Sequence, residues 1–308
     1  MRKSRIQFQK GVSLQAFISA YGTQEQCFQS IFKLKWPNGF ICPKCEATRY
    51  YRIQKGDRLQ CKSCRHQTSI KVGTLFEHSK LPLTQWFLAI YFISQDKGSI
   101  SSMHLMRFLS VSYNTAWFIR QKLLVAMREG EKQRQLSGLI HIDDGYLGGK
   151  RKGGKRGRGS PGKQAFIAAI SLKKGRPIFI KLNTLKRLNK QSIALWAKEN
   201  LASGSTLQMD GALAYAGLKK CSFLVQQFDI SKNLSLRDHL FKWINTLMGN
   251  VKRAIDGTFH ALRIPYMQRY LDGFVWRFNR RFDLQHCFDS LIQTASLTQP
   301  LTCKQLRA

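Results

Sequence analysis

The sequence predicts an α/β fold: a mixed sheet with flanking helices, preceded by a small β module and a helical segment. Three observations predict it. Apolar strand-like runs alternate with helical patterns after residue 137, apolar residues recur at helical spacing between 83 and 127, and two Cys-x-x-Cys pairs lie between 42 and 64. Alternating strand and helix patterns are typical of α/β proteins. With 308 residues, the chain is long enough for two or three domains.

The charge of the chain restricts its partners. It has 51 Lys and Arg against 17 Asp and Glu, a formal net charge of +34. Such an excess favours a polyanion, above all nucleic acid, over a surface that is merely solvated. The longest apolar stretch, Trp86–Ile93, is far shorter than the roughly 20 residues of a membrane span. No apolar segment follows the basic N-terminus, so we expect a cytoplasmic, nucleoid-associated protein without a membrane partner.

The β module is predicted from four cysteines, after a helical lead-in over residues 1–35. Each Cys-x-x-Cys directs two thiolates to one point, and residues 46–60 are long enough for a hairpin that brings the two pairs together. Four thiolates at one point form a tetrahedral, structural Zn²⁺ site. The alternative is a pair of separate redox dithiols. The expected ribbon spans residues 36–70, and its zinc ligands are Cys42, Cys45, Cys61 and Cys64.

The helical segment is expected over residues 80–130. Helices are predicted from Thr84 to Ile93, after Ser99 or Ser101, and from Tyr113 to Met127, with a turn before the last. Three helices with a tight turn before the third fit a helix-turn-helix, although three-helix bundles also occur without DNA. If DNA binds, the third helix would offer Tyr113, Asn114, Arg120 and Lys122.

The remaining elements follow from apolar periodicity. Strands predicted after residue 137 place Asp143 and Asp210 directly behind apolar runs. Side chains converge at strand ends in an α/β sheet, and carboxylates there can hold Mg²⁺ for phosphoryl transfer. The alternative is that Asp143 begins a turn with Gly145 and Asp210 caps a helix at Gly211. The expected strands are 139–142, 165–172, 177–182, 205–209 and 222–229, and the expected helices are 192–201, 236–256 and 265–280.

A basic segment, residues 148–163, follows Asp143. It is rich in Gly, Lys and Arg and has too few apolar residues to build a core. Beside a metal site, its cations would suit a DNA backbone; the alternative is a loop that only aids solubility. The residues expected to contact DNA are Lys150, Arg151, Lys152, Lys155, Arg156 and Arg158.

Four stretches together resemble a known family. They are KWPNGFICPKC from Lys35 with GTLF from Gly73, IDDGYLGG from Ile142, MDG from Met209 with Tyr215, and the segment from Asn245 to His260 with RYLDGF and RFNRR behind it. In this order and spacing they resemble bacterial insertion-sequence transposases of the DDE superfamily, which combine an N-terminal zinc ribbon with an RNase H-like catalytic domain. The resemblance covers roughly residues 20–285.

The resemblance implies the chemistry and the partners. It implies an RNase H-like catalytic domain over 138–285, with residues 286–308 as a C-terminal tail. The activity would be metal-dependent DNA cleavage and strand transfer at element ends, with Mg²⁺ or Mn²⁺. The partners would be terminal inverted repeats and target DNA, bound by a homodimer or larger oligomer. Asp143 matches the first catalytic acid, Asp144 its supporting acidic neighbour, and Asp210 the second acid.

The third acidic position of the family falls on Asn245, which implies a subgroup with Asn at this site. An amide oxygen can still bind Mg²⁺, although it brings no charge. Lys252 lies two helical turns further on the same face, where it would hold a DNA phosphate. Two alternatives stay open: a catalytically inactive transposase, in which Asn245 is only a polar helix residue, and a non-enzymatic zinc-ribbon DNA-binding protein.

Overall fold

The chain forms two compact units. The computed structural model describes residues 8–53, 56–96, 98–148, 162–228, 240–259 and 262–307. Unit 1 comprises residues 1–130 together with 280–308, and unit 2 comprises residues 131–279. The finer domain limits expected from the sequence stay predictions.

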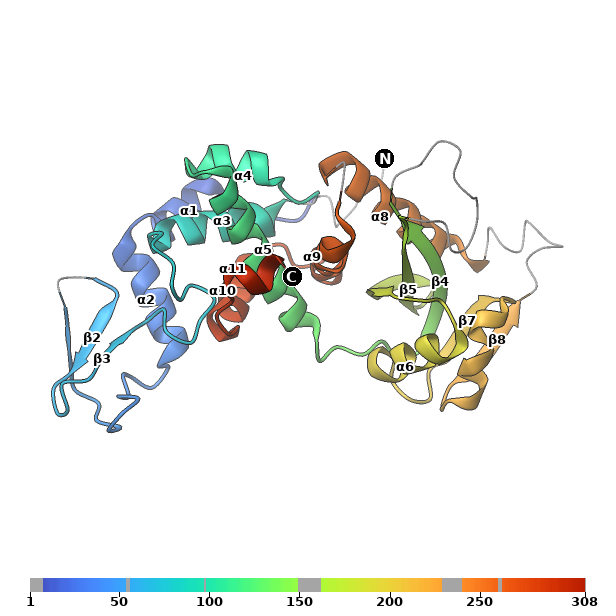
Figure 1. Ribbon diagram of the computed structural model, residues 1–308, viewed down its shortest axis with the longest axis horizontal. Coiled ribbons are helices and arrows are strands. Elements are labelled where there is room, and N and C mark those ends of the chain that lie inside the picture. Colours follow the sequence, from blue (N-terminus) through green and yellow to red (C-terminus); the bar gives the residue numbers. More distant parts are fainter. Residues whose placement is uncertain are drawn as a thin grey trace. The chain divides into compact units, whose positions relative to one another are not determined.

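Unit 1 begins with two helices and a small antiparallel sheet of order β1-β2-β3 (Figure 1). The hydroxyl of Thr23 caps the second helix by accepting from the N–H of Gln26 at 3.2 Å. The rings of Phe32 and Phe40 both pack on Tyr50, with centroids 5.7 Å and 4.9 Å apart. The second helix therefore shares a core with the sheet. These elements are α1 (Leu14–Tyr21), α2 (Gln24–Lys35), β1 (Tyr50–Arg52), β2 (Arg58–Cys61) and β3 (Gln67–Ser69).

The predicted three-helix segment is present in unit 1. The hydroxyl of Ser101 caps the second of these helices by accepting from the N–H of His104 at 3.2 Å, and Ser112 caps the third in the same way. Ser110, between them, has a left-handed backbone with φ of 51°. No described helix is both long and apolar enough to cross a membrane. The helices are α3 (Leu83–Gln95), α4 (Ser102–Leu109) and α5 (Tyr113–Glu131).

The C-terminal residues also belong to the core of unit 1. Two helices form there, α10 (Cys287–Leu297) and α11 (Cys303–Arg307), where the sequence led us to expect only a tail. Phe288 of α10 is buried, and its ring contacts Phe17 of α1 at 5.5 Å and Phe87 of α3 at 6.1 Å. The apolar face of α10 is thus completed only by residues far away in the sequence, which is why its local pattern was not informative.

Unit 2 is built on a five-stranded mixed sheet of order β6-β5-β4-β7-β8. Strands β4, β5 and β6 pair antiparallel, whereas β7 pairs parallel to both β4 and β8. This order and these directions are those of the RNase H-like arrangement and confirm the expected fold class. The strands are β4 (Leu139–Leu147), β5 (Gln164–Lys173), β6 (Arg176–Leu185), β7 (Thr206–Asp210) and β8 (Leu224–Phe228).

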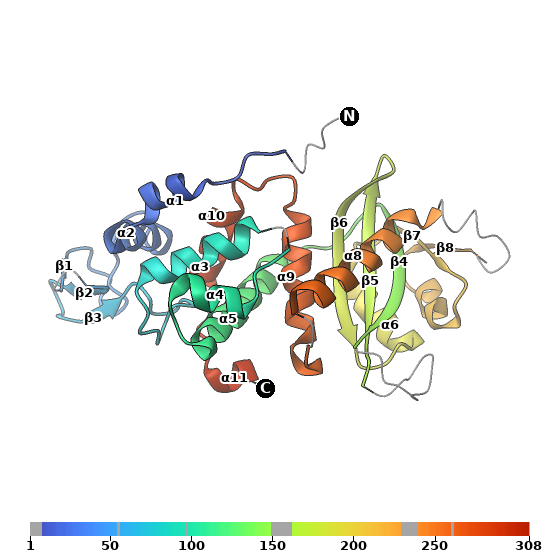
Figure 2. The same ribbon diagram turned by 90° about the horizontal axis from the view of Figure 1, so that it is seen from above.

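Helices cover both faces of this sheet (Figure 2). Even-numbered residues of β4, such as Ile140 and Ile142, pack with α6 and the 3₁₀ segment η1, whereas Leu147 packs with α8 and α9 on the other face. A Cβ at Gly145 would lie 2.6 Å from Cε of Met248, so α8 packs closely on β4 at this position. These elements are α6 (Lys190–Asn200), η1 (Leu213–Lys220), α8 (Lys242–Phe259), η2 (Ile264–Tyr266) and α9 (Met267–Asn279).

The two ends of unit 2 are tied together by a buried polar cluster. Nδ2 of Asn279 donates to a carboxylate oxygen of Glu131 at 2.7 Å, and Nζ of Lys181 donates to the Glu131 carbonyl at 2.8 Å. The amide oxygen of Asn279 accepts from the N–H of Ile180 in β6 at 2.8 Å. The first and last residues of the unit are therefore fixed to the same strand, which stabilises the sheet that carries the acids.

Candidate metal centres and active site

The four predicted zinc ligands converge in the ribbon. Sγ of Cys42 lies 3.6 Å from that of Cys64, and Sγ of Cys45 lies 3.6 Å from that of Cys61. All four sulfurs lie within 4.8 Å of one another, and among the described residues no other group of three or more His, Cys, Asp or Glu is so close. The arrangement is one four-thiol cluster, as tetrahedral zinc requires, and not two separate dithiols.

Matching backbone turns build the cluster. The N–H of Cys42 donates to the carbonyl of Ala47 at 3.0 Å, and the N–H of Cys61 donates to that of His66 at 2.9 Å. The residues after the second cysteine of each pair, Glu46 and Arg65, have left-handed backbones with φ of 61° and 58°. Each pair is thus folded by its own local turn.

Backbone N–H groups within these turns favour the thiolate form. The N–H of Cys64, followed by that of Ser63, lowers the pKa of Cys61 to about 6 although partial burial opposes the shift. Thiolate is the form that binds metal. The geometry of the cluster is therefore consistent with a structural zinc site, and the backbone N–H groups favour ionisation of Cys61.

The two predicted catalytic acids lie on neighbouring strands. Asp210 is the last residue of β7, and Asp143 lies within β4, not at its end as we expected. β4 extends beyond Ile142 because its pairing with β5 continues to Leu147. Its pairing with β7, however, ends at His141. Asp143 therefore lies in a strand that is held on one side only.

The register aligns the two acids. In the parallel pairing Leu139 lies opposite Thr206 and His141 opposite Gln208, and the same register carried two residues further sets Asp143 opposite Asp210. Neighbours that alternate with the acids, such as Met209, pack on the face covered by α6. Both carboxylates therefore point to the face covered by α8.

The environment of Asp143 disfavours a lone negative charge. Burial, together with the carboxylates of Asp144 and Asp210, raises the pKa of Asp143 to about 6, while the Asp144 N–H and Lys252 act in the opposite direction. That N–H donates to Oδ1 of Asp143 at 2.8 Å. A bound cation would relieve the repulsion between the carboxylates, as the sequence argument required.

Asp144 points to the opposite face of the sheet. Its Oδ1 accepts a hydrogen bond from the hydroxyl of Tyr215 at 2.8 Å. Tyr215 is fully buried in the cluster under α6, and burial followed by the charge of Asp144 raises its pKa. Asp144 is thus near Asp143 in sequence but separated from the α8 face by the sheet itself.

Helix α8 runs beside β4 in the same direction. The ring of Phe241 contacts the ring of His141, with centroids 5.6 Å apart. Seven residues further along the chain, the side chain of Met248 lies against Gly145. Asp143 lies midway between these two strand positions. The part of α8 midway between Phe241 and Met248 is therefore level with Asp143.

Asn245 occupies that part of α8. Its side chain is exposed, and among the described residues it makes no hydrogen bond to Asp143 or Asp210. Lys252, two turns further along the same side of the helix, is exposed as well, and its charge lowers the pKa of Asp143. Asn245 is thus level with the acids without touching them, and its role as a ligand stays a prediction.

The predicted DNA-binding residues of α5 differ in their exposure to solvent. Arg120 is only 2% exposed, and Nζ of Lys122 donates to the carbonyl of Leu75 at 3.1 Å within unit 1. Burial also lowers the pKa of Lys122. These facts argue against DNA contact by Arg120 and Lys122, whereas Tyr113 and Asn114 at the start of α5 are exposed.

The basic segment cannot be placed in the same way. All of its predicted DNA contacts lie outside the described residues, so their role stays a prediction. They are Lys150, Arg151, Lys152, Lys155, Arg156 and Arg158.

Two polar residues beside the acids were missed by sequence reasoning. His141 and Gln208 precede Asp143 and Asp210 by two positions, so strand alternation places them on the same face. His141 is buried, and burial lowers its pKa. The sequence contained a signal for them, because residues two positions apart in a strand point to the same face, and each of these residues lies two positions before an acid.

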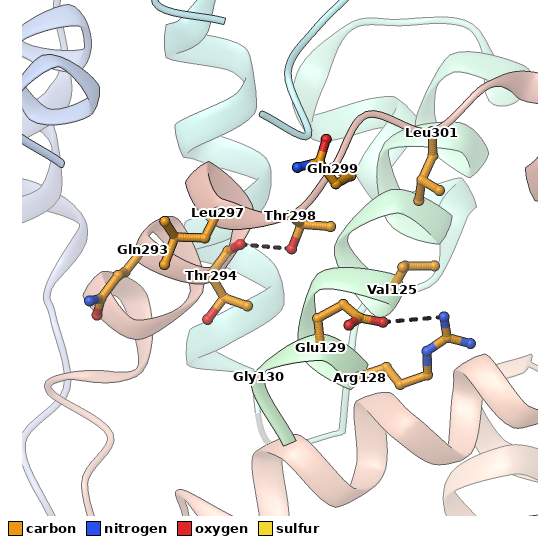
Figure 3. A pocket seen from close by; sticks show the side chains of 10 residues that line it. All are labelled: Val125, Arg128, Glu129, Gly130, Gln293, Thr294, Leu297, Thr298, Gln299 and Leu301. Atoms are coloured by element: carbon orange, nitrogen blue, oxygen red, sulfur yellow. Dashed lines mark hydrogen bonds and ion pairs between the residues drawn. The ribbon is translucent and has the colours of Figure 1, made fainter. Parts of the chain in front are cut away.

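A pocket of about 410 Å³ in unit 1 contains none of the predicted site residues (Figure 3). It lies between the C-terminal ends of α5 and α10, and Val125 and Leu297 contribute apolar surface. Arg128 and Glu129 form an ion pair of 3.3 Å at its side. No cluster of nucleophilic or metal-binding groups faces it among the described residues.

Two family models match the parts of the chain where the two modules were predicted. The transposase zinc-ribbon domain matches residues 22–67, and the ISXO2-like transposase domain matches residues 135–279. The chain is 30% identical over 142 residues to an uncharacterized protein in transposable element ISH50 of Halobacterium salinarum. That match covers 45% of this chain and 47% of the relative, so the chain spans about half the length of the curated relative.

Solved structures give only distant matches. A chain of the simian T-cell lymphotropic virus intasome in complex with PP2A regulatory subunit B56 gamma is 11% identical, with a TM-score of 0.30 over 56% of this chain and 63% of that one. The Mos1 transposase paired-end complex with left transposon end is 13% identical, with a TM-score of 0.21 over 70% and 81%. Scores this low support no inference about this chain.

Proposed function

We propose that this chain, which carries an ISXO2-like transposase domain behind a transposase zinc-ribbon domain, catalyses metal-dependent DNA cleavage and strand transfer at the ends of an insertion sequence. The observation that carries the proposal is the alignment of Asp143 and Asp210. Each follows by two residues the last paired position of two parallel neighbouring strands, His141 of β4 and Gln208 of β7, and both lie on the same face of the sheet. A zinc-ribbon DNA-binding protein without chemistry has no need of such a pair.

The residues at this face fit Mg²⁺ or Mn²⁺. Carboxylate and amide oxygens are the hard ligands that these ions prefer, and the negative charges of Asp144 and Asp210 beside Asp143 favour a cation there. Asp143 and Asp210 would bind the ion, and Asn245 would add a neutral oxygen. When bound, the ion supplies Lewis acidity at a phosphate and favours an ionised oxygen nucleophile.

The side chains around the ion would bind it, hold the DNA phosphate and support the strand that carries Asp143. The pKa of Asp143, about 6, leaves this group mainly ionised at neutral pH and so able to bind a cation. Lys252, exposed on the same side of α8 as Asn245, would hold a DNA phosphate beside the acids. Asp144, on the other face, would support the strand and not touch the substrate.

DNA would be bound mainly by parts of the chain outside the acid site. The excess of Lys and Arg favours contact with phosphates, and the zinc ribbon would position one part of the element end. We expect terminal inverted repeats and target DNA as partners, a homodimer or larger oligomer on DNA, and association with the nucleoid.

The test uses duplex oligonucleotides that carry the ends of the element with its flanking DNA. The parent protein with Mg²⁺ or Mn²⁺ should cleave at the element boundary, and Asp143→Asn should bind the duplex but not cleave it. Glu199→Gln is the matched control, because it removes one exposed carboxylate of unit 2 from α6, on the opposite face of the sheet.

Asn245 favours one rival function, an inactive protein that still binds DNA, because a neutral residue stands where the family has an acid. Binding without cleavage by the parent, at any concentration of either metal, would support that rival. Cleavage by Asp143→Asn at the parent rate would contradict both the site and the proposal.

A further inference from the structure

The strands that carry the two acids lose their mutual pairing just before the acids. The parallel ladder between β4 and β7 ends at His141 and Gln208. Beyond it, Asp143 is held by β5, opposite Ala168, and Asp210 is held by β8, opposite Phe228. The separation between the two carboxylates therefore depends on which contacts join β4 and β7 beyond His141 and Gln208, where their backbone pairing has ended.

A side-chain hydrogen bond spans this gap on the opposite face. The hydroxyl of Tyr215, five residues after Asp210, donates to Oδ1 of Asp144, the residue after Asp143, at 2.8 Å. Tyr215 is fully buried and Asp144 is half-buried, so the bond is partly shielded from water. A hydrogen bond to a carboxylate in such a place is strong, and leaving either partner unpaired is costly.

The segment that carries Tyr215 is itself rigidly placed. Oδ1 of Asp210 accepts from the N–H of Ala212 at 3.2 Å and so fixes the turn after β7. Further on, η1 packs closely on α6, because a Cβ at Gly217 would lie 2.7 Å from the carbonyl oxygen of Lys190. A displacement of Asp144 relative to Tyr215 would therefore be transmitted to β4 and not absorbed by η1.

We propose that Tyr215 is a positioning residue: its hydrogen bond to Asp144 replaces the missing strand pairing and sets the separation of Asp143 and Asp210. The inference rests on the proposed function, since it assigns those two acids to one metal site. Tyr215 acts from the far face of the sheet, so it touches neither the metal nor DNA. Groups that orient metal ligands in this way typically contribute about 10- to 100-fold in metal affinity.

The experiment measures Mn²⁺ binding to the full, zinc-loaded chain by electron paramagnetic resonance. Tyr215→Phe removes the hydroxyl but keeps the ring, and its Mn²⁺ affinity should fall by about 10-fold or more. Asp144→Asn keeps an oxygen that can accept from Tyr215, so its loss should be smaller. Cleavage of element-end DNA by the two variants should fall in the same order.

The matched control removes an equally buried hydrogen bond from the same face of the sheet. Asn183 accepts from Nε1 of Trp196 at 2.8 Å and lies in the same row as Asp144, two strands away across Ile167. Asn183→Ala should lower the melting temperature without changing Mn²⁺ affinity. If Tyr215 contributed only to stability, Tyr215→Phe and Asn183→Ala would both have a lower melting temperature and an unchanged Mn²⁺ affinity.

The possible failures are distinguishable. If the parent binds no more Mn²⁺ than Asp143→Asn does, the proposed function fails. If the parent binds Mn²⁺ and folded Tyr215→Phe binds it equally well, the positioning role is overturned. If Tyr215→Phe does not fold, two variants of Asp144 decide. Asp144→Asn loses the charge but keeps an acceptor for Tyr215, whereas Asp144→Leu loses both. Weaker Mn²⁺ binding by Asp144→Leu than by Asp144→Asn supports the role, and equal binding contradicts it.

Discussion

The cysteine cluster of unit 1 and the acid pair of unit 2 are formed to different degrees. In the ribbon, four sulfurs lie within 4.8 Å of one another before any metal is considered. In unit 2, Asp143 and Asp210 share a face and a register, but Asn245 is exposed and bonded to neither of them. All four ligands of the cysteine cluster are in place. In unit 2 the two acids are held by strands and form the fixed half of the site, whereas Asn245 on α8 belongs to its open half.

If unit 2 has the function proposed above, the difference follows from what each site must do. A structural metal site is closed by protein ligands and contributes directly to folding, so its geometry arises with the fold. A catalytic metal site must leave positions for the substrate. Asp143 and Asp210 are fixed by strands, and the remaining ligands can be gathered when metal and DNA bind.

Loss of a single zinc ligand should unfold the ribbon. In Cys61→Ser we expect the zinc content to fall from about one per chain to near zero, because structural zinc contributes about 10–16 kcal/mol in small zinc-dependent folds. Zinc analysis and proteolysis within residues 36–70 measure the change. Cys221→Ser, outside the cluster, is the control and should keep its zinc. Unchanged zinc in Cys61→Ser would show that the four sulfurs do not form one site.

Loss of either acid should leave the fold intact and stop cleavage. For Asp210→Asn we expect cleavage of element-end DNA to fall by about 10³-fold or more, because the ligand supports several kcal/mol of charge stabilisation in the transition state. The melting temperature should change little, since Asp210 is at a strand end and only half-buried. A comparable fall with Glu199→Gln would show that the effect is not specific to the site.

Substitution of Asn245 should sharpen the distinction between the fixed and the open half. Asn245→Ala should reduce cleavage by about 10-fold or more, as expected for a weaker ligand group, and raise the Mg²⁺ concentration that is needed. Asn245→Asp adds a negative charge and should lower that concentration. The measurement is the cleavage rate as a function of Mg²⁺. Identical Mg²⁺ curves for both variants and the parent would remove Asn245 from the site.

The basic segment should give the smallest effect per residue. Replacing Lys150, Arg151, Lys152, Lys155 and Arg156 by alanine should flatten the dependence of log affinity on log salt by up to about 4, at roughly 0.9 for each phosphate contact. A salt titration of duplex binding measures the slope. A variant with the parent slope would show that these cations do not contact the DNA backbone.

The sequence predicted local features better than it predicted assembled ones. The four cysteines could be assigned because each pair is folded by its own turn. The α10 helix could not, because its apolar face is completed by Phe17 and Phe87. Arg120 looked like a helix-surface cation, yet tertiary packing buries it.

The candidate site shows the same limit. Asp143 and Asp210 could be found from apolar runs that end in acids. The faces of Asp143 and Asp144 follow from strand alternation, but only if β4 is known to continue past Ile142, and that depends on its pairing with β5. The bond between Tyr215 and Asp144 joins positions 71 apart and could not be seen from local pattern.

The central claim is that Asp143, Asp210 and Asn245 surround one divalent cation. The most direct test replaces magnesium by ferrous iron and adds ascorbate and peroxide, so that radicals formed at the bound metal cut the nearby chain. If the three residues share one cation, cuts should fall close to all of them, be suppressed by Mg²⁺ and be absent in Asp143→Asn. Cuts that miss these three segments, or that persist unchanged in Asp143→Asn, would contradict it.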